Sequence, residues 1–200
     1  MTTIRLGPVS ISRVIEIPRS SYPTADMLPD STAAAVAKHH AWLRPHFMDA
    51  DTGDLGSRIQ TWIVRTPRHT VLIDTGVGND KNRSGNPLWH MRKGSFLDDL
   101  RAAGVTPEQV DYVITTHLHV DHVGWNTRLV NGQWVPTFPR AKYVMAGDEW
   151  QFWKFEHEAG REEYGCVADS VVPVVEAGQA VLVDDDYAID EHLRFEPSRG

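Results

Sequence analysis

Four side chains that can bind a metal ion stand close together near the middle of the chain. They are His117, His119, Asp121 and His122. Neutral imidazole is the commonest protein ligand for metals near pH 7. Imidazole combined with carboxylate suits Zn²⁺, Mn²⁺ or Fe²⁺ better than Ca²⁺ or Mg²⁺. The run therefore predicts a transition-metal site, and the alternative is a polar surface loop that is rich in histidine.

The spacing of these side chains indicates how they could share metal ions. In an extended segment, residues two apart point to the same side. His117 and His119 can therefore hold one ion from one face. Asp121 has the same parity and His122 the opposite one, so a turn at Asp121 could bring that pair toward a second ion beside the first.

The elements before this run are those that a binding loop needs. Residues 111–115 are apolar and β-branched, which predicts a short buried strand that ends at the first ligand. Ligand sites in α/β folds gather at the carboxyl ends of such strands. Upstream, Thr106 and Gln109 flank Pro107 in a pattern typical of a capping box, so we expect a helix to begin there.

The rest of the chain alternates strand and helix patterns, without an internal repeat or a linker. Asp74-Thr75-Gly76 opens a glycine-rich loop, and Asn131-Gly132 predicts a hairpin turn. The patterns predict strands at residues 9–17, 58–65, 70–73, 142–145, 180–183 and 193–195, and helices at 32–43, 96–103 and 148–159. This order is typical of an α+β or α/β fold.

Composition limits the classes of protein that fit. The 200 residues suit one domain, residues 1–200, with a sizeable core. The net charge of −7 and the lack of a Lys/Arg cluster argue against nucleic-acid binding. No apolar run approaches the length of a membrane span, no secretory core follows Met1, and Cys166 has no partner for a disulfide. We therefore expect a cytoplasmic protein.

Two motifs resemble the metallo-β-lactamase superfamily of metal-dependent hydrolases. The first is the run from His117 to His122, and the second is Asp74-Thr75-Gly76 after a hairpin of strands, in the order and separation of that family. The resemblance implies an αββα sandwich. Residues 74–81 and 122–126 are most similar to the branch of lactonases and organophosphate hydrolases. Glyoxalase-II-like thioesterases share the metal motif and remain an alternative.

The resemblance also implies a role for each motif residue. His117 and His119 would hold one ion, and Asp121 and His122 a second, with two Zn²⁺ in a complete site and Mn²⁺ or Fe²⁺ as alternatives. A metal-bound hydroxide would attack a lactone, an ester or a phosphoryl centre. Asp121 would orient this water as a catalytic residue. Asp74 would fix a ligand imidazole, and its alternative is an ordinary turn carboxylate.

The family takes its remaining ligands from a later Gly-His loop and beyond. Residues 193–200 resemble the strand that leads into that loop, so we expect the sandwich to lack much of its C-terminal half. One hypothesis is a hydrolase of small-molecule esters or lactones whose chain continues further. The other is a catalytically impaired remnant that binds only a metal or a partner. A homo-oligomer is also expected, because an incomplete sheet exposes an edge and apolar surface.

Overall fold

The computed structural model describes residues 3–184 and 186–198. Contacts divide the chain into two compact units. The larger comprises Met1–Glu16 and Gln60–Gly200, and the smaller comprises Ile17–Ile59. Two long strands, β2 (Val9–Tyr22) and β3 (Leu55–Arg65), contribute residues to both units. The expectation of one domain stays a prediction.

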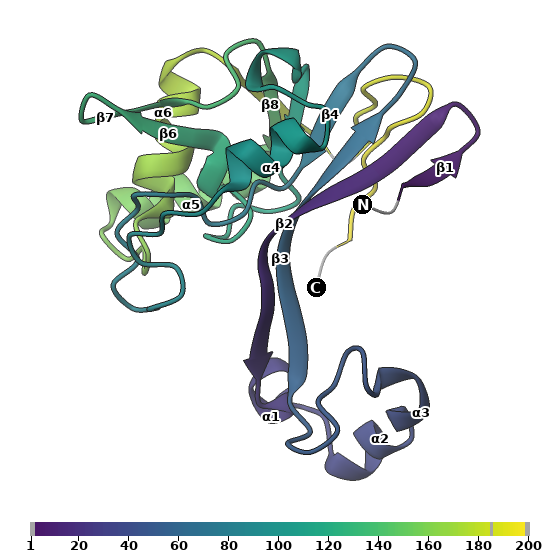
Figure 1. Ribbon diagram of the computed structural model, residues 1–200. Helices are drawn as coiled ribbons and strands as arrows, with labels where there is room; N and C mark the ends of the chain where they lie inside the picture. Colours follow the sequence, from purple (N-terminus) through teal and green to yellow (C-terminus); the bar gives the residue numbers. More distant parts are fainter. Residues whose placement is uncertain (1–2, 185, 199–200) are drawn as a thin grey trace. The chain divides into compact units, whose positions relative to one another are not determined.

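A seven-stranded sheet in the order β1-β2-β3-β4-β5-β8-β9 forms the framework (Figure 1). The β1–β2 and β3–β4 pairs are antiparallel, whereas β4, β5, β8 and β9 run parallel. Besides β2 and β3, its strands are β1 (Ile4–Leu6), β4 (Thr70–Ile73), β5 (Tyr112–Ile114), β8 (Lys142–Ala146) and β9 (Ala180–Val183). The expected mixed α/β fold is confirmed.

A separate hairpin joins β6 (Thr127–Val130) to β7 (Gln133–Pro136). Its turn residues Asn131 and Gly132 have φ angles of 51° and 80°. Two successive positive φ values match the right-handed twist of the flanking strands. The turn predicted from the Asn-Gly dipeptide is therefore confirmed.

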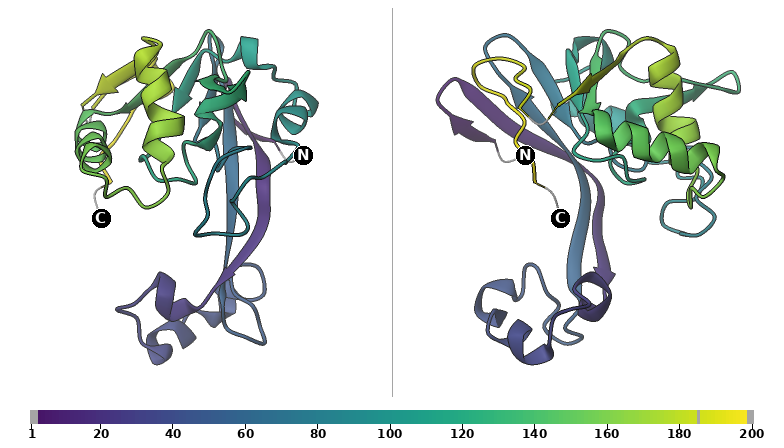
Figure 2. Two further views of the ribbon diagram at one scale, coloured as in Figure 1. Left: turned by 90° about the vertical axis from the view of Figure 1, so that its left-hand side faces the viewer. Right: turned by 180° about the vertical axis from the view of Figure 1, so that it is seen from behind.

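The helices of the larger unit lie on one side of its sheet (Figure 2). They are α4 (Phe96–Ala102), α5 (Gly147–Glu158) and α6 (Val172–Glu176), with a π-helical turn η3 (Val167–Val171) and the 3₁₀ turns η1 (Pro107–Gln109) and η2 (Gly124–Asn126). No helix within the described residues is long and apolar enough to cross a membrane.

Each face of the sheet carries its own hydrophobic cluster, because neighbouring residues of a strand point to opposite faces. Leu72 and Val113 belong to the cluster that includes Phe96 of α4 and the apolar residues of η3 and α6. Val71 and Ile114 belong to the other cluster, which Ile189, Leu193 and Phe195 of the C-terminal segment cover. The helical side therefore supplies most of the core.

The smaller unit contains three short helices, α1 (Thr24–Met27), α2 (Ala33–Ala37) and α3 (His40–Leu43). The single helix expected at 32–43 is wrong, because between α2 and α3 the N–H groups of Lys38 and His39 donate to carbonyls three residues back, Ala35 and Val36, so the α-helical hydrogen-bond pattern is interrupted. Thr32 caps α2 as its hydroxyl accepts the N–H of Ala35 at 3.1 Å. None of the three helices buries a residue, and short helices without packing partners are marginal.

Two further expectations need correction. The helix expected after Thr106 is only the 3₁₀ turn η1, although the capping box is present and Thr106 N–H donates to Gln109 Oε1 at 2.9 Å. The strand expected at 193–195 is absent from the described residues. Instead, Arg194 forms an isolated bridge with Ala188, so the segment pairs with its own preceding residues.

Candidate metal centre

Sheet topology brings the two sequence motifs to one edge. Strands β4 and β5 are parallel neighbours, and Ile73 is in register with Ile114. Asp74 follows the first strand and the histidine run follows the second, so both emerge at the carboxyl ends. Asp74 N–H donates to Ile114 O at 2.8 Å, which joins the start of the two loops.

The segment from His117 to Asp121 alternates between core and surface. Leu118 and Val120 are buried in the core, whereas His119 is exposed. The centroid of the His117 ring lies 4.4 Å from that of His119 and 4.0 Å from that of His122. The structure thus gathers three imidazoles on one side of the loop.

His122 lies between two carboxylates. Its Nδ1 is 2.9 Å from Asp74 Oδ2, and its Nε2 is 3.4 Å from Asp121 Oδ2. Burial acts to lower the pKa of His122, but the two carboxylates outweigh burial and raise this pKa to about 9. His122 therefore carries a proton at pH 7 in this arrangement.

His117 has the opposite electrostatic environment. Burial and the neighbouring imidazoles of His122 and His119 lower the pKa of His117. The ring is therefore neutral at pH 7, which is the form that a metal ligand requires. Asp74 accepts hydrogen bonds from Thr116 N at 2.9 Å and Thr116 Oγ1 at 3.0 Å, beside His117. Asp74 therefore fixes the start of the loop.

The donor set has the chemistry of a zinc site but does not form a closed one. Across residues 3–184 and 186–198, no three His, Cys, Asp or Glu side chains converge so that they could hold one ion. His122 would have to lose its proton at one ring nitrogen before it could coordinate. The described residues thus fall short of the three protein ligands usual in a catalytic zinc site.

A half-buried carboxylate that the sequence did not single out stabilises both loops. Glu16 of β2 accepts hydrogen bonds from Val77 N at 2.7 Å, Gly78 N at 3.1 Å and Trp125 Nε1 at 2.8 Å. Burial raises the pKa of Glu16. Its partners lie 61 to 109 residues away in sequence, so no local pattern could have identified it.

The two loops also touch directly through backbone. Gly124 N–H donates to Gly76 O at 2.7 Å, and Thr75 N–H donates to His122 O at 2.7 Å. A Cβ atom on Gly124 would lie 1.9 Å from the backbone carbon of Val77. Only glycine fits at this crossing, which holds the end of the histidine run against the Asp74 loop.

A buried ionic cluster holds the far end of the Asp74 loop. Arg83 donates to both carboxylate oxygens of Asp169 at 2.7 Å, and Lys81 Nζ lies 3.3 Å from Asp169 Oδ1. Lys81 Nζ also donates to Thr127 Oγ1 at 2.8 Å. Both cationic side chains are fully buried, and burial lowers the pKa of Lys81 to about 8. The cluster ties this loop to η3 and β6.

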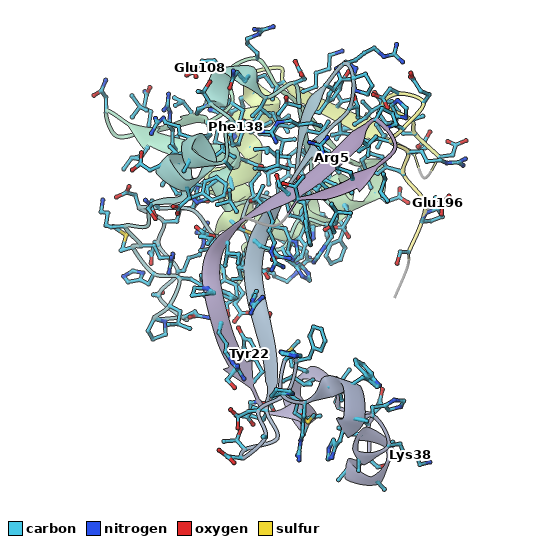
Figure 3. All side chains as sticks on the ribbon, turned by 45° about the vertical axis from the view of Figure 1, so that its right-hand side comes forward. Arg5, Tyr22, Lys38, Glu108, Phe138 and Glu196 are labelled. Carbon is cyan, nitrogen blue, oxygen red and sulfur yellow. The ribbon has the colours of Figure 1, made fainter. Side chains whose placement is uncertain are left out.

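Two cavities flank the histidine run, and both include His119 in their walls. The larger, of about 1290 Å³, is lined by His117, Glu149 and Phe152, and by Glu196 of the C-terminal segment, which Figure 3 labels. The smaller, of about 260 Å³, is lined by Asp121 together with Trp89, Trp153 and Tyr164. The loop therefore has space for a small molecule on two sides.

Comparison with known families yields one match. The sequence model described as "Metallo-beta-lactamase superfamily" matches residues 54–193. These residues include the Asp74 loop and the whole histidine run. The comparison with curated proteins returned no match.

Solved structures share the fold at low sequence identity. A probable metal-dependent hydrolase from Staphylococcus aureus aligns with a TM-score of 0.71 and 17% identity, over 94% of this chain and 63% of that chain. Hydrolase AbOPH aligns with a TM-score of 0.64 and 23% identity, over 92% of this chain and 62% of that one. AidC, a dizinc quorum-quenching lactonase, aligns with a TM-score of 0.59 and 19% identity, over 94% of this chain and 62% of that chain. The chain thus spans less than two thirds of each structure.

Proposed function

Because the chain belongs to the metallo-beta-lactamase superfamily, we propose that it forms the metal-binding portion of a hydrolase that acts on lactones or esters. The observation that carries this proposal is the histidine run at the carboxyl end of β5, joined to Asp74 at the end of β4. Several solved neighbours are lactonases, and AidC is described in complex with a product. These neighbours support lactones as the substrate class. Hydrolysis of a thioester in place of a lactone or an ester would instead favour the thioesterase alternative.

In this proposal, His117 and His119 hold one ion, while Asp121 and His122 hold another. Zn²⁺ is the proposed metal, with Mn²⁺ and Fe²⁺ as alternatives. A bound ion would supply Lewis acidity and lower the pKa of water. Each ion has only two ligands in this set, so a complete site needs ligands from outside the described residues.

The chain's own side chains have separate tasks. Asp121 would orient the attacking water and pass a proton to the leaving group, which makes it the proposed catalytic residue. Asp74 holds Thr116 and faces His122 Nδ1, so it sets the orientation of that ring. Neutral His117 needs no proton loss before it binds an ion. The larger cavity, open beside His117 and His119, receives the substrate.

The proposal is tested by hydrolysis assays on the zinc-loaded protein with a γ-lactone, a phenyl ester, a thioester and a phosphotriester. We expect the lactone or the ester to be cleaved only slowly, because the described residues supply two ligands for each ion, and this activity should be lost on adding a chelator. His119→Ala should remove activity, whereas His40→Ala, which removes a histidine from the smaller unit, should not. Activity that survives both the chelator and His119→Ala would contradict the proposal.

A further inference from the structure

Helix α5 begins immediately after β8, and its first turn reaches the histidine run. We infer that Glu149 and Trp153 of this helix form a clamp that positions His117 and His119. The inference rests on the proposed function, since positioning matters only if these imidazoles bind an ion. Strand β8 is the parallel neighbour of β5, so the helix after one strand and the loop after the other start side by side.

One carboxylate oxygen makes both contacts of the clamp. Glu149 Oε2 accepts the N–H of Leu118 at 3.0 Å and the indole N–H of Trp153 at 3.1 Å. Trp153 lies four residues after Glu149, one helical turn further along the same face. The indole therefore fixes the carboxylate, and the carboxylate fixes the loop backbone.

The peptide group that Glu149 holds lies between the two histidines. Leu118 is fully buried, and its carbonyl is approached by Cys166 Sγ at 3.8 Å. Buried backbone groups need partners, and here side chains from α5 and from the segment before η3 provide them. The backbone orientation at Leu118 sets the directions in which the flanking imidazoles leave the chain.

Trp153 also contacts one of the histidines directly. Its ring meets the His119 ring edge to face, with centroids 5.5 Å apart and planes at 84°. This contact limits the rotation of His119. Glu149 lines the larger cavity beside His117 and His119, so its negative charge also lies near any cation that they bind.

A role in capping its own helix does not explain Glu149. The first residue before α5 is Ala146, and α5 has no side-chain cap hydrogen bond. A carboxylate in the first turn of a helix is favoured by the helix dipole, and its oxygens accept hydrogen bonds from N–H groups. The Glu149 carboxylate instead accepts a hydrogen bond from the loop, at the N–H of Leu118.

The first test is a Co²⁺ titration of the 200-residue protein, followed by visible absorption. Loss of an outer partner of a ligand typically weakens metal binding 10- to 100-fold, so we expect about this loss in Glu149→Ala. Glu149→Gln should recover part of the affinity, because its amide oxygen accepts the same two N–H groups. Glu158→Ala is the matched control, since Glu158 lies on the same helix, is exposed and forms an exposed ion pair with Lys154.

The second test needs no metal. Hydrogen exchange at the Leu118 amide, followed by NMR, should be at least tenfold faster in Glu149→Ala and in Trp153→Phe than in wild type and Glu158→Ala. Thermal unfolding identifies variants that fold, and Glu149→Gln serves if Glu149→Ala does not. Unchanged Leu118 exchange would overturn the clamp, whether or not the protein binds Co²⁺. Faster exchange with wild-type Co²⁺ affinity would overturn its positioning role. If wild type binds no Co²⁺, the proposed function fails separately, and the positioning role falls with it.

Discussion

The histidine run and the smaller unit differ both in their content of regular structure and in the contacts that stabilise them. Residues 115–123 contain no helix or strand, but they form hydrogen bonds with Glu149 and with the backbone of the Asp74 loop, and Leu118, Val120 and Val123 are buried. The smaller unit has three helices, but none buries a residue, and Trp42 and Phe47 are exposed. Order in this chain therefore follows specific buried contacts more closely than helix content.

The largest expected effect comes from the ionic cluster behind the Asp74 loop. Asp169→Asn would leave Lys81 and Arg83 buried without a countercharge, which typically costs about 3–5 kcal/mol. Urea unfolding should show this loss. The matched control is Asp98→Asn, because Asp98 forms an exposed ion pair with Arg101 and should change stability by less than about 1 kcal/mol. Equal effects of the two changes would contradict the contrast between buried and exposed partners.

The next effect comes from the crossing of the two loops. Gly124→Ala would push a methyl group into the backbone of Val77, and overpacking of this kind costs about 3 kcal/mol. Gly132→Ala is its control, because no atom lies within 4 Å of its Cβ position and only the positive φ is strained, at about 1 kcal/mol. Calorimetric melting measures the loss of stability in both variants. A smaller loss in Gly124→Ala than in Gly132→Ala would show that the two loops are not tightly joined.

A smaller effect is expected at alkaline pH, where the direction of the change in stability can be predicted. The pKa of Lys81 is about 8 when folded, below its ordinary value of 10.5. Between these values the unfolded chain binds more protons at this group, so its contribution to stability is least below pH 8 and rises toward pH 10.5. From pH 7 to 9.5, the free energy of unfolding of the wild type should rise by about 2 kcal/mol relative to that of Lys81→Met in urea unfolding. A constant difference would mean that Lys81 keeps its ordinary pKa.

The smallest effect concerns the smaller unit. Backbone amides in α2 and α3 should exchange with solvent faster than the buried amides of residues 118–126, because few buried contacts oppose local opening. Hydrogen exchange with mass spectrometry compares the two regions in one experiment. Equal protection would indicate that the smaller unit is covered by a partner, in agreement with the homo-oligomer expected from the sequence, which stays a prediction.

The predictions that the structure confirms depend on sequence patterns among neighbouring residues. The strand before the histidine run, the Asn131-Gly132 turn and the capping box at Thr106 each depend on residues within a few positions of one another. The single helix predicted at 32–43 is wrong, because alanine-rich propensity alone does not stabilise a long helix that buries none of its residues.

The side chains that hold the loops of the candidate site in place could not be predicted in the same way. Glu149 contacts Leu118 across 31 residues, and Lys81 contacts Asp169 across 88. In sequence, Glu149 reads as an ordinary first-turn acid of a helix, and Asp169 carries no motif. Their roles become visible only when the parallel order of β5 and β8 brings distant segments together.

The most direct test of the account is the zinc content of the 200-residue protein after equilibrium dialysis against Zn²⁺. Elemental analysis should be made on wild type, on the double variant His117→Ala with His119→Ala, and on His40→Ala as the control. We expect at least one zinc ion per chain in wild type and control, and loss of that ion in the double variant. No zinc in wild type, or equal zinc in all three proteins, would contradict the claim that the histidine run is a metal-binding loop.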